Sequence, residues 1–273
     1  MKRFVCLLTV CALALALCAC GSFAPRMAVS VQRVAALESL RVEAVTEIEA
    51  TMSAFGADVP YQLELRLRGD VQREPARGFF ELTISSGEEG EKLYFFAQPA
   101  EDGTIRVYLS FDGQSWEEYV VEPGELAEAA TELATPNPVD FIKLGVGLSQ
   151  LFEQSGTVTL PDGEGVVYEG VIPGELLQEA LRSADDLESL LPSAAAEETL
   201  SLVGDVPVRL VIGKADNLPR SAELDLTEAL REPCAALLKA YLGGFGMDFG
   251  IESLKMALSF SDFNQVSVSV PEL

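Results

Sequence analysis

The chain contains no histidine, and this absence limits the catalytic chemistry that the sequence can support. Ser-His-Asp and Cys-His nucleophile systems need an imidazole as general base, and a histidine-based zinc site needs one as ligand. Acidic pairs such as Asp185-Asp186 and Glu197-Glu198 are expected by chance among 43 Asp and Glu residues. They lack the alternating spacing and central glycine of a calcium loop, so a weak surface calcium site stays only an alternative. We expect a protein that is not an enzyme and holds no metal or cofactor.

The thiols offer a different chemistry, because a cysteine can be acylated. Leu17-Cys18-Ala19-Cys20 places a small residue directly before Cys20 and a leucine three residues before it. This pattern resembles the lipobox cut by the bacterial lipoprotein signal peptidase, and it predicts that Cys20 carries lipid and becomes the mature N-terminus. A cut that leaves Cys18 first would put bulky Leu17 where a small side chain is needed.

The residues before Cys20 fit a signal peptide. Lys2 and Arg3 form a positive n-region, and the uncharged apolar run from Phe4 to Leu17 is short for a permanent membrane span of roughly 20 residues. The alternatives are an ordinary secretory signal and a stop-transfer anchor. We predict a signal peptide over residues 1–19, a lipidated tether over 20–30 and a single domain over 31–273, held extracytoplasmically on a bacterial membrane.

The remaining thiol, Cys234, follows Pro233 near an expected helix start. A helix N-terminus can lower the pKa of a thiol, but a buried and unreactive cysteine is the commoner case and the one we favour. Cys20 is expected to carry lipid, so no intramolecular disulfide is predicted in the mature chain.

The net charge of −24 indicates what the domain does not bind. Nucleic-acid binding needs clustered Lys and Arg, so we expect no nucleic-acid partner. A basic patch for anionic headgroups is equally absent from the composition, so membrane attachment would depend on the acyl chains. Each buried methylene contributes about 0.8 kcal/mol to such attachment.

Alternation of apolar and polar residues predicts a series of strands. It is plainest from Tyr61 to Leu67 and recurs in runs that short turns separate, ending at the Asp112-Gly113 dipeptide, which favours a tight hairpin into 116–121. Consecutive strands with no helix between them form an antiparallel meander. The apolar members of the later runs are Phe80, Leu82 and Ile84, then Leu93 and Phe95, then Ile105, Val107, Leu109 and Phe111.

Helices are expected at five places, one of them a short helix that Pro123-Gly124-Glu125 opens and that runs through Leu133. A brief one covers Val31–Leu40, and one that is apolar nearly all round runs from Val139 to about Glu153, which would make it a buried helix. An amphipathic helix is predicted over Glu175–Leu191 and a short one around Cys234–Leu242. A hairpin of 157–160 with 166–172 and strands near 208–212, 222–226, 254–260 and 266–270 complete the expected order.

Two fragments have a familiar form. Tyr108 to Trp116, a strand with an Asp-Gly turn before a tryptophan, resembles LolA/LppX-like bacterial lipoproteins, and the ending Leu258–Pro271 resembles their closing hairpin. The order of elements over most of residues 40–271 also resembles that of these lipoproteins, and Asn217-Leu218-Pro219 before a strand is a weaker similarity. The resemblance implies an α+β fold, a strongly curved antiparallel half-barrel that is not closed and whose concave face is covered by helices. The space between them takes up lipids, acyl chains or lipidated proteins in that family.

From the alternation and the resemblance together we predict a monomeric, membrane-anchored binder or carrier of a lipid or acylated ligand. The alternative is a cell-surface interaction or structural lipoprotein whose helices fill the sheet completely. The expected ligand-lining residues are Phe80, Leu82, Phe95, Val107, Leu109, Phe141, Leu144 and Leu148.

Overall fold

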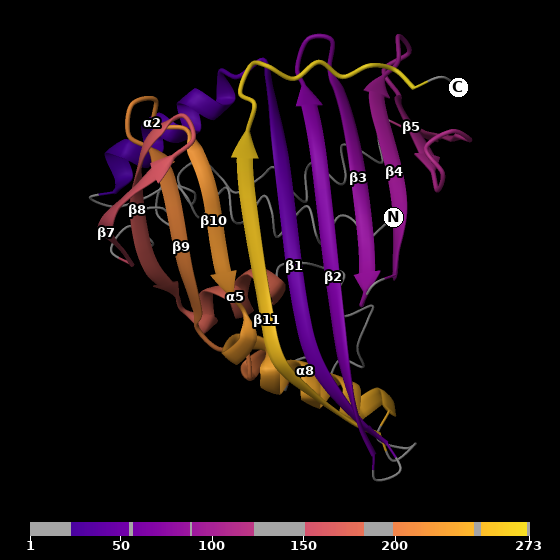
Figure 1. Ribbon diagram of the computed structural model, residues 1–273, viewed down its shortest axis with the longest axis vertical. Helices are drawn as coiled ribbons and strands as arrows, with labels where there is room; N and C mark the ends of the chain where they lie inside the picture. The colour runs from indigo at the N-terminus through magenta and orange to yellow at the C-terminus, as the bar shows by residue number, and fades with distance from the viewer. Residues whose placement is uncertain are drawn as a thin grey trace.

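The computed structural model describes residues 23–54, 57–87, 89–122, 151–182, 199–242 and 247–271. In these residues, eleven strands form one antiparallel sheet in the order β6-β5-β4-β3-β2-β1-β11-β10-β9-β8-β7 (Figure 1). The strands are β1 (Ser39–Ala54), β2 (Ala57–Gln72), β3 (Arg77–Ser86), β4 (Glu89–Pro99), β5 (Ile105–Ser110), β6 (Glu117–Val121), β7 (Phe152–Leu160), β8 (Gly163–Ile172), β9 (Val206–Gly213), β10 (Pro219–Asp225) and β11 (Met247–Ser261). The predicted large, unclosed antiparallel sheet is confirmed, with β6 and β7 at its two edges.

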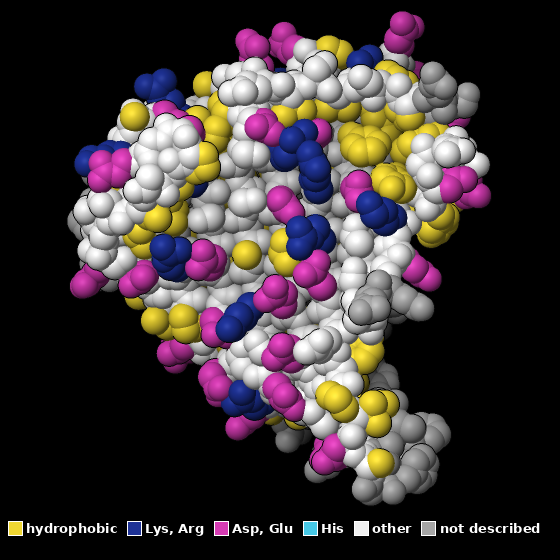
Figure 2. Space-filling view, viewed as in Figure 1, with side chains coloured by type: hydrophobic (Ala, Val, Ile, Leu, Met, Phe, Trp, Pro, Cys, Tyr) yellow, Lys and Arg dark blue, Asp and Glu magenta, His cyan; other side chains and the backbone are white. Residues whose placement is uncertain are grey.

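The alternation of the sequence separates the sheet into two faces. We call the apolar face the one that bears Val42, Gly69, Phe80 and Phe95, which lie opposite one another in adjacent strands. The charged face bears the alternate residues, and Figure 2 shows their Lys, Arg, Asp and Glu side chains over the central strands. Ion pairs cross between strands there, among them Arg66–Glu43 at 3.1 Å and Lys92–Glu81 at 2.6 Å.

Three helices are described: α2 (Ala24–Ala35), α5 (Gly174–Arg182) and α8 (Thr227–Leu242). In Figure 1 they lie at opposite ends of the β7–β11 half of the sheet, α2 at one end and α5 and α8 at the other. The side chain of Thr227 fixes α8, since its hydroxyl accepts a hydrogen bond from the Leu254 N–H of β11 at 3.0 Å. Each contributes a side chain to the core cluster on the apolar face of β8–β11, namely Met27, Leu177 and Ala229. These three helices do not show the expected covering of the whole concave face.

The N-terminal helix differs from its prediction. The helix expected over Val31–Leu40 instead spans Ala24–Ala35, and β1 begins at Ser39, so part of the expected tether is helical. Phe23 and Met27 are buried, and the Phe23 ring lies 5.3 Å from Phe152 and 4.3 Å from Tyr168 between ring centroids. Their burial against β7 and β8 stabilises a helix that has no side-chain cap.

The end of the chain also differs from its prediction. No strand forms over residues 266–270, because both sides of β11 are already paired, with β1 and with β10. The segment runs instead across the strand ends, in yellow at the top of Figure 1. Its Val268 N–H donates to Gln72 Oε1 at 2.8 Å, and its Val266 N–H donates to Ser39 Oγ at 3.1 Å. We call residues 265–271 the C-terminal strap.

The strap covers an aromatic cluster on the charged face. Val268 is buried with Phe96 and Tyr108, and Phe79 and Trp116 pack against this group. The Trp116 ring stands edge-on to Phe79 with 6.4 Å between centroids. Trp116 therefore has a packing role in this cluster.

The turn between β5 and β6 is longer than a tight hairpin. Leu109 lies opposite Glu117, and within the turn only Gly113 has a positive φ, of 72°. The Asp112 carboxylate accepts hydrogen bonds from the N–H groups of Gln114 and Ser115, which hold the pKa of Asp112 well below its usual range. Side-chain bonding of this kind replaces the two-residue turn predicted from Asp-Gly.

Candidate functional site

The structure brings together the five predicted ligand-lining residues that it describes. Phe80 lies opposite Phe95 and Phe95 opposite Leu109, so three of them form a row across β3, β4 and β5. Leu82 and Val107 lie two residues along their strands from members of that row, which puts them on the same apolar face. The other three, Phe141, Leu144 and Leu148, lie outside the described residues, as does Cys20.

Two glycines set the position of the central ring. A Cβ built on Gly69 would lie 2.5 Å from Phe80 Cδ1, and one built on Gly78 would lie 2.8 Å from Phe80 Cε2. The Phe80 ring therefore covers both glycines on the sheet. No other residue could stand at either position without moving the ring, since ordinary contacts of Cβ are 3.4–4 Å.

Burial divides the apolar face into two parts. On β8–β11 its side chains are almost fully buried, with Tyr168 6%, Leu210 3%, Ala222 3% and Leu258 1% exposed. On β2–β6 they are mostly half-buried or exposed, and Ile84, Tyr61 and Tyr119 are 42–45% exposed. We call the apolar face of β2–β6 the open apolar surface. Its members are Leu63, Leu65, Phe80, Leu82, Leu93, Phe95, Val107 and Leu109 with the three exposed residues above.

Electrostatics also distinguish this surface. Register places every Lys and Arg of β1–β6 on the opposite, charged face: Arg41, Arg66, Arg68, Arg77, Lys92 and Arg106. Among the side chains that the structure describes on this surface, two carboxylates lie towards its rim, Glu91 opposite Ile84 and Glu117 opposite Leu109. The Tyr119 hydroxyl donates to Glu117 at 2.8 Å, and this bond raises the pKa of Tyr119.

The helix predicted from Val139 to about Glu153 can be compared with the structure only at its end. Phe152 and Glu153 belong to β7, so the helix boundary was wrong there. Phe152 is buried against Phe23, whereas the earlier part of that helix lies outside the described residues.

Sequence reasoning missed buried residues that pack against the β7–β11 half of the sheet. Phe23 and Met27 were assigned to a tether, although their spacing of four residues is that of one helix face. The start of α8 was predicted near Cys234. The helix begins at Thr227, whose N–H donates a hydrogen bond to the Asp225 carboxylate at 3.1 Å. Cys234 therefore lies inside α8, and burial raises the pKa of its thiol. A raised pKa is the direction expected for the unreactive cysteine that we favoured.

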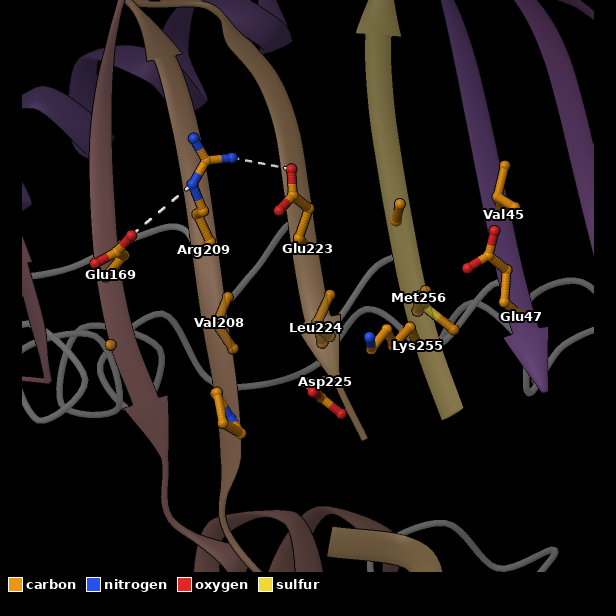
Figure 3. A pocket seen from close by; sticks show the side chains of 13 residues that line it. Val45, Glu47, Glu169, Val208, Arg209, Glu223, Leu224, Asp225, Lys255 and Met256 are labelled. Atoms are coloured by element: carbon orange, nitrogen blue, oxygen red, sulfur yellow. Dashed lines mark hydrogen bonds and ion pairs between the residues drawn. The ribbon is translucent and has the colours of Figure 1, made fainter. Parts of the chain in front are cut away.

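A second candidate surface lies on the charged face. It is a shallow depression of about 570 Å³ over β8–β11 and β1, lined by Glu47, Glu169, Arg209, Glu223 and Lys255 among others (Figure 3). Arg209 pairs with Glu223 at 3.0 Å and approaches Glu169 at 3.9 Å. The guanidinium is engaged with the protein's own carboxylates, and the side chains form a cross-strand charge ladder.

Within the described ranges, no three Asp, Glu or Cys side chains come together as metal ligands. None of the helices in the part of the chain that the structure describes is long and apolar enough to cross a bilayer.

Comparison with known proteins returns structural likenesses at low identity. No protein-family model and no curated protein sequence matches the chain. The chain is similar to the lipoprotein LppX of Mycobacterium tuberculosis, at 13% identity over 89% of this chain and 96% of that one, with a TM-score of 0.42. LprF of Mycobacterium bovis gives 12% identity over 91% and 95%, with a TM-score of 0.44.

A LolA superfamily protein of Nitrosomonas europaea is more distant, at 10% identity over 89% of this chain and 94% of that one, with a TM-score of 0.22. LppX and a LolA superfamily protein are thus among the solved structures to which the chain is similar.

Proposed function

We propose that this protein is a membrane-anchored, non-catalytic carrier or binder of an apolar ligand, and that the ligand lies against the open apolar surface of β2–β6. Cys20 supplies the anchor through its lipid. The observation that carries the proposal is the contrast between the two halves of the apolar face. Phe23 and Met27 are buried in the core, whereas Phe80, which packs at the border of that core, forms a half-buried row with Phe95 and Leu109.

The composition of the surface suits an apolar ligand. Aromatic and aliphatic side chains lie side by side across β2–β6, and a contiguous apolar surface of this kind marks a binding site more often than scattered residues do. Covering such a surface contributes about 25 cal/mol per Å² of apolar area removed from water. An acyl chain is apolar along its length and has no polar groups that need partners.

Uptake of lipid by detergent-free protein tests the proposal. After incubation with phosphatidylcholine vesicles that contain dioleoylglycerol, native mass spectrometry should show protein with a bound lipid mass. Leu82→Trp places a larger side chain in the space assigned to the lipid and should lower uptake about ten-fold, a loss of about 1.4 kcal/mol in binding. Thr83→Trp is the matched control, because Thr83 is the next residue and lies on the charged face.

Two results would count against the proposal. Repeated recovery of empty wild-type protein would favour the alternative of a filled core that serves protein interaction. Equal loss of uptake in Leu82→Trp and Thr83→Trp would mean that the apolar face of β3 is not where lipid lies.

A further inference from the structure

We propose that the ligand is an uncharged lipid such as a diacylglycerol or triacylglycerol, and that lipids with an anionic headgroup, including phosphatidic acid and free fatty acid, are rejected. This inference rests on the proposed function and specifies the chemistry of its ligand.

The first ground is the absence of a basic partner on the surface itself. In the described strands β1–β6 all six basic side chains project from the charged face, and Arg41, Arg66, Lys92 and Arg106 are paired there with carboxylates. A phosphate or carboxylate bound over Phe80 or Phe95 would find no counter-charge on these strands. Desolvating an anion without a partner costs several kcal/mol, whereas a glycerol ester has no charge to desolvate.

The second ground is repulsion at the rim. On the open apolar surface the structure describes two charged side chains, those of Glu91 and Glu117. Both are exposed. An anionic headgroup left at the rim, in contact with water, would lie near these carboxylates. The net charge of −24 adds a repulsive field over the whole molecule.

The stretches of sequence between the described ranges do not reverse this balance. In residues 123–150 and 183–198 the one basic residue is Lys143, and acidic residues outnumber it. Among described residues, Arg26 of α2 has a buried Nη1 without a hydrogen-bond partner. Phe23 and Met27, on either side of Arg26, belong to the core cluster against which Phe80 and Leu82 also pack. Arg26 is therefore the basic residue whose contribution the experiment must exclude.

The experiment compares two lipids with the same acyl chains. Vesicles of phosphatidylcholine with either radiolabelled dioleoylglycerol or radiolabelled dioleoyl phosphatidic acid are incubated with wild-type protein, and label bound to the re-isolated protein is counted. We expect uptake of dioleoylglycerol to exceed that of phosphatidic acid by about ten-fold or more at low salt, with a smaller ratio at high salt where rim charges are screened.

Charge variants connect the preference to the rim. Glu91→Lys with Glu117→Lys should raise uptake of phosphatidic acid at least several-fold and leave dioleoylglycerol uptake within two-fold of wild type. Glu91→Gln with Glu117→Gln should give an intermediate value. These residues are exposed, so the variants are expected to fold, and circular dichroism checks this.

Each other outcome has a defined meaning. Equal uptake of both lipids overturns the charge inference and leaves the proposed function standing. Preferential uptake of phosphatidic acid that Arg26→Gln abolishes also overturns it, and assigns the anion to Arg26. Uptake of neither lipid, with triacylglycerol and fatty acid also unbound, overturns the proposed function together with this inference.

Discussion

Replacing Gly69 by alanine tests whether the Phe80 ring is held as the structure describes. The added Cβ would lie 2.5 Å from Phe80 Cδ1 and 2.6 Å from Cε1, against an ordinary contact of 3.4–4 Å. The ring must therefore move by about 1 Å, away from the sheet and into the space where we place the ligand. Overpacking of this extent costs about 1–3 kcal/mol.

Gly250→Ala is the matched control. Gly250 lies in β11 with nothing within 4 Å of a built Cβ, so alanine there meets no clash. Alanine in a strand loses less backbone entropy on folding than glycine, so this variant should be up to about 1 kcal/mol more stable than wild type. The two variants should differ by about 2 kcal/mol, which corresponds to about 4–8 °C in melting temperature for a domain of this size.

Thermal unfolding followed by circular dichroism measures that difference, and lipid uptake measures the effect on the ligand space. We expect Gly69→Ala to melt at the lower temperature and to take up less lipid than Gly250→Ala. Equal melting temperatures and equal uptake would refute the placement of the Phe80 ring against the glycines.

Three other predictions concern the anchor, the strap and an ionic cluster. Cys20→Ser should leave the domain's melting temperature unchanged and move the protein from the membrane to the soluble fraction, because serine provides no thiol for lipid; persistence at the membrane would contradict lipidation. Gln72→Ala removes the acceptor of the Val268 N–H and should lower the free energy of unfolding by about 1 kcal/mol, with faster hydrogen exchange at Val268 but not at Leu258 in the sheet. Burial would raise the pKa of Asp216, but hydrogen bonds from Arg220 and from the Leu218 N–H outweigh it and lower the pKa below 3.8. That stabilisation is present above pH 3.8 and is lost as pH falls through the folded-state pKa, so acid unfolding monitored by circular dichroism should be steeper in wild type than in Asp216→Asn.

The strands were predictable because the alternation of apolar and polar residues can be read directly along the sequence. Tyr61, Leu63, Leu65 and Leu67 alternate with polar residues, and β2 extends through them with the apolar members on one face. The five strand residues chosen as ligand-lining share that face for the same reason. A period of two determines which side chains share a face, and the pairing of consecutive strands then brings them into rows.

The errors arose where tertiary contacts decide between local patterns. Val266, Val268 and Val270 alternate like a strand, yet both edges of β11 are occupied and the segment becomes a strap. The tether was expected from its position after Cys20, yet Phe23 and Met27 meet a complementary surface on β7 and β8. Neither the occupied edge nor that surface is visible in a local stretch of sequence.

The site is only partly predictable for a related reason. Register and face follow from alternation, whereas the division into a buried and a half-buried part depends on which elements lie over the sheet. The charge asymmetry was available in the sequence, since Arg66 and Arg68 alternate with Leu65 and Leu67. This asymmetry bears on ligand binding only once strand pairing shows that the basic residues of β1–β6 share one face.

Quenching of tryptophan fluorescence by brominated lipid tests the central claim most directly. The native chain has one tryptophan, Trp116, which packs in the strap-covered cluster on the charged face. A second protein with Phe95→Trp and Trp116→Phe carries its one tryptophan on the open apolar surface. We predict that diacylglycerol with brominated acyl chains quenches the Phe95→Trp protein and leaves native Trp116 fluorescence unchanged. Quenching of Trp116 without quenching of the Phe95→Trp protein would contradict the placement of the ligand.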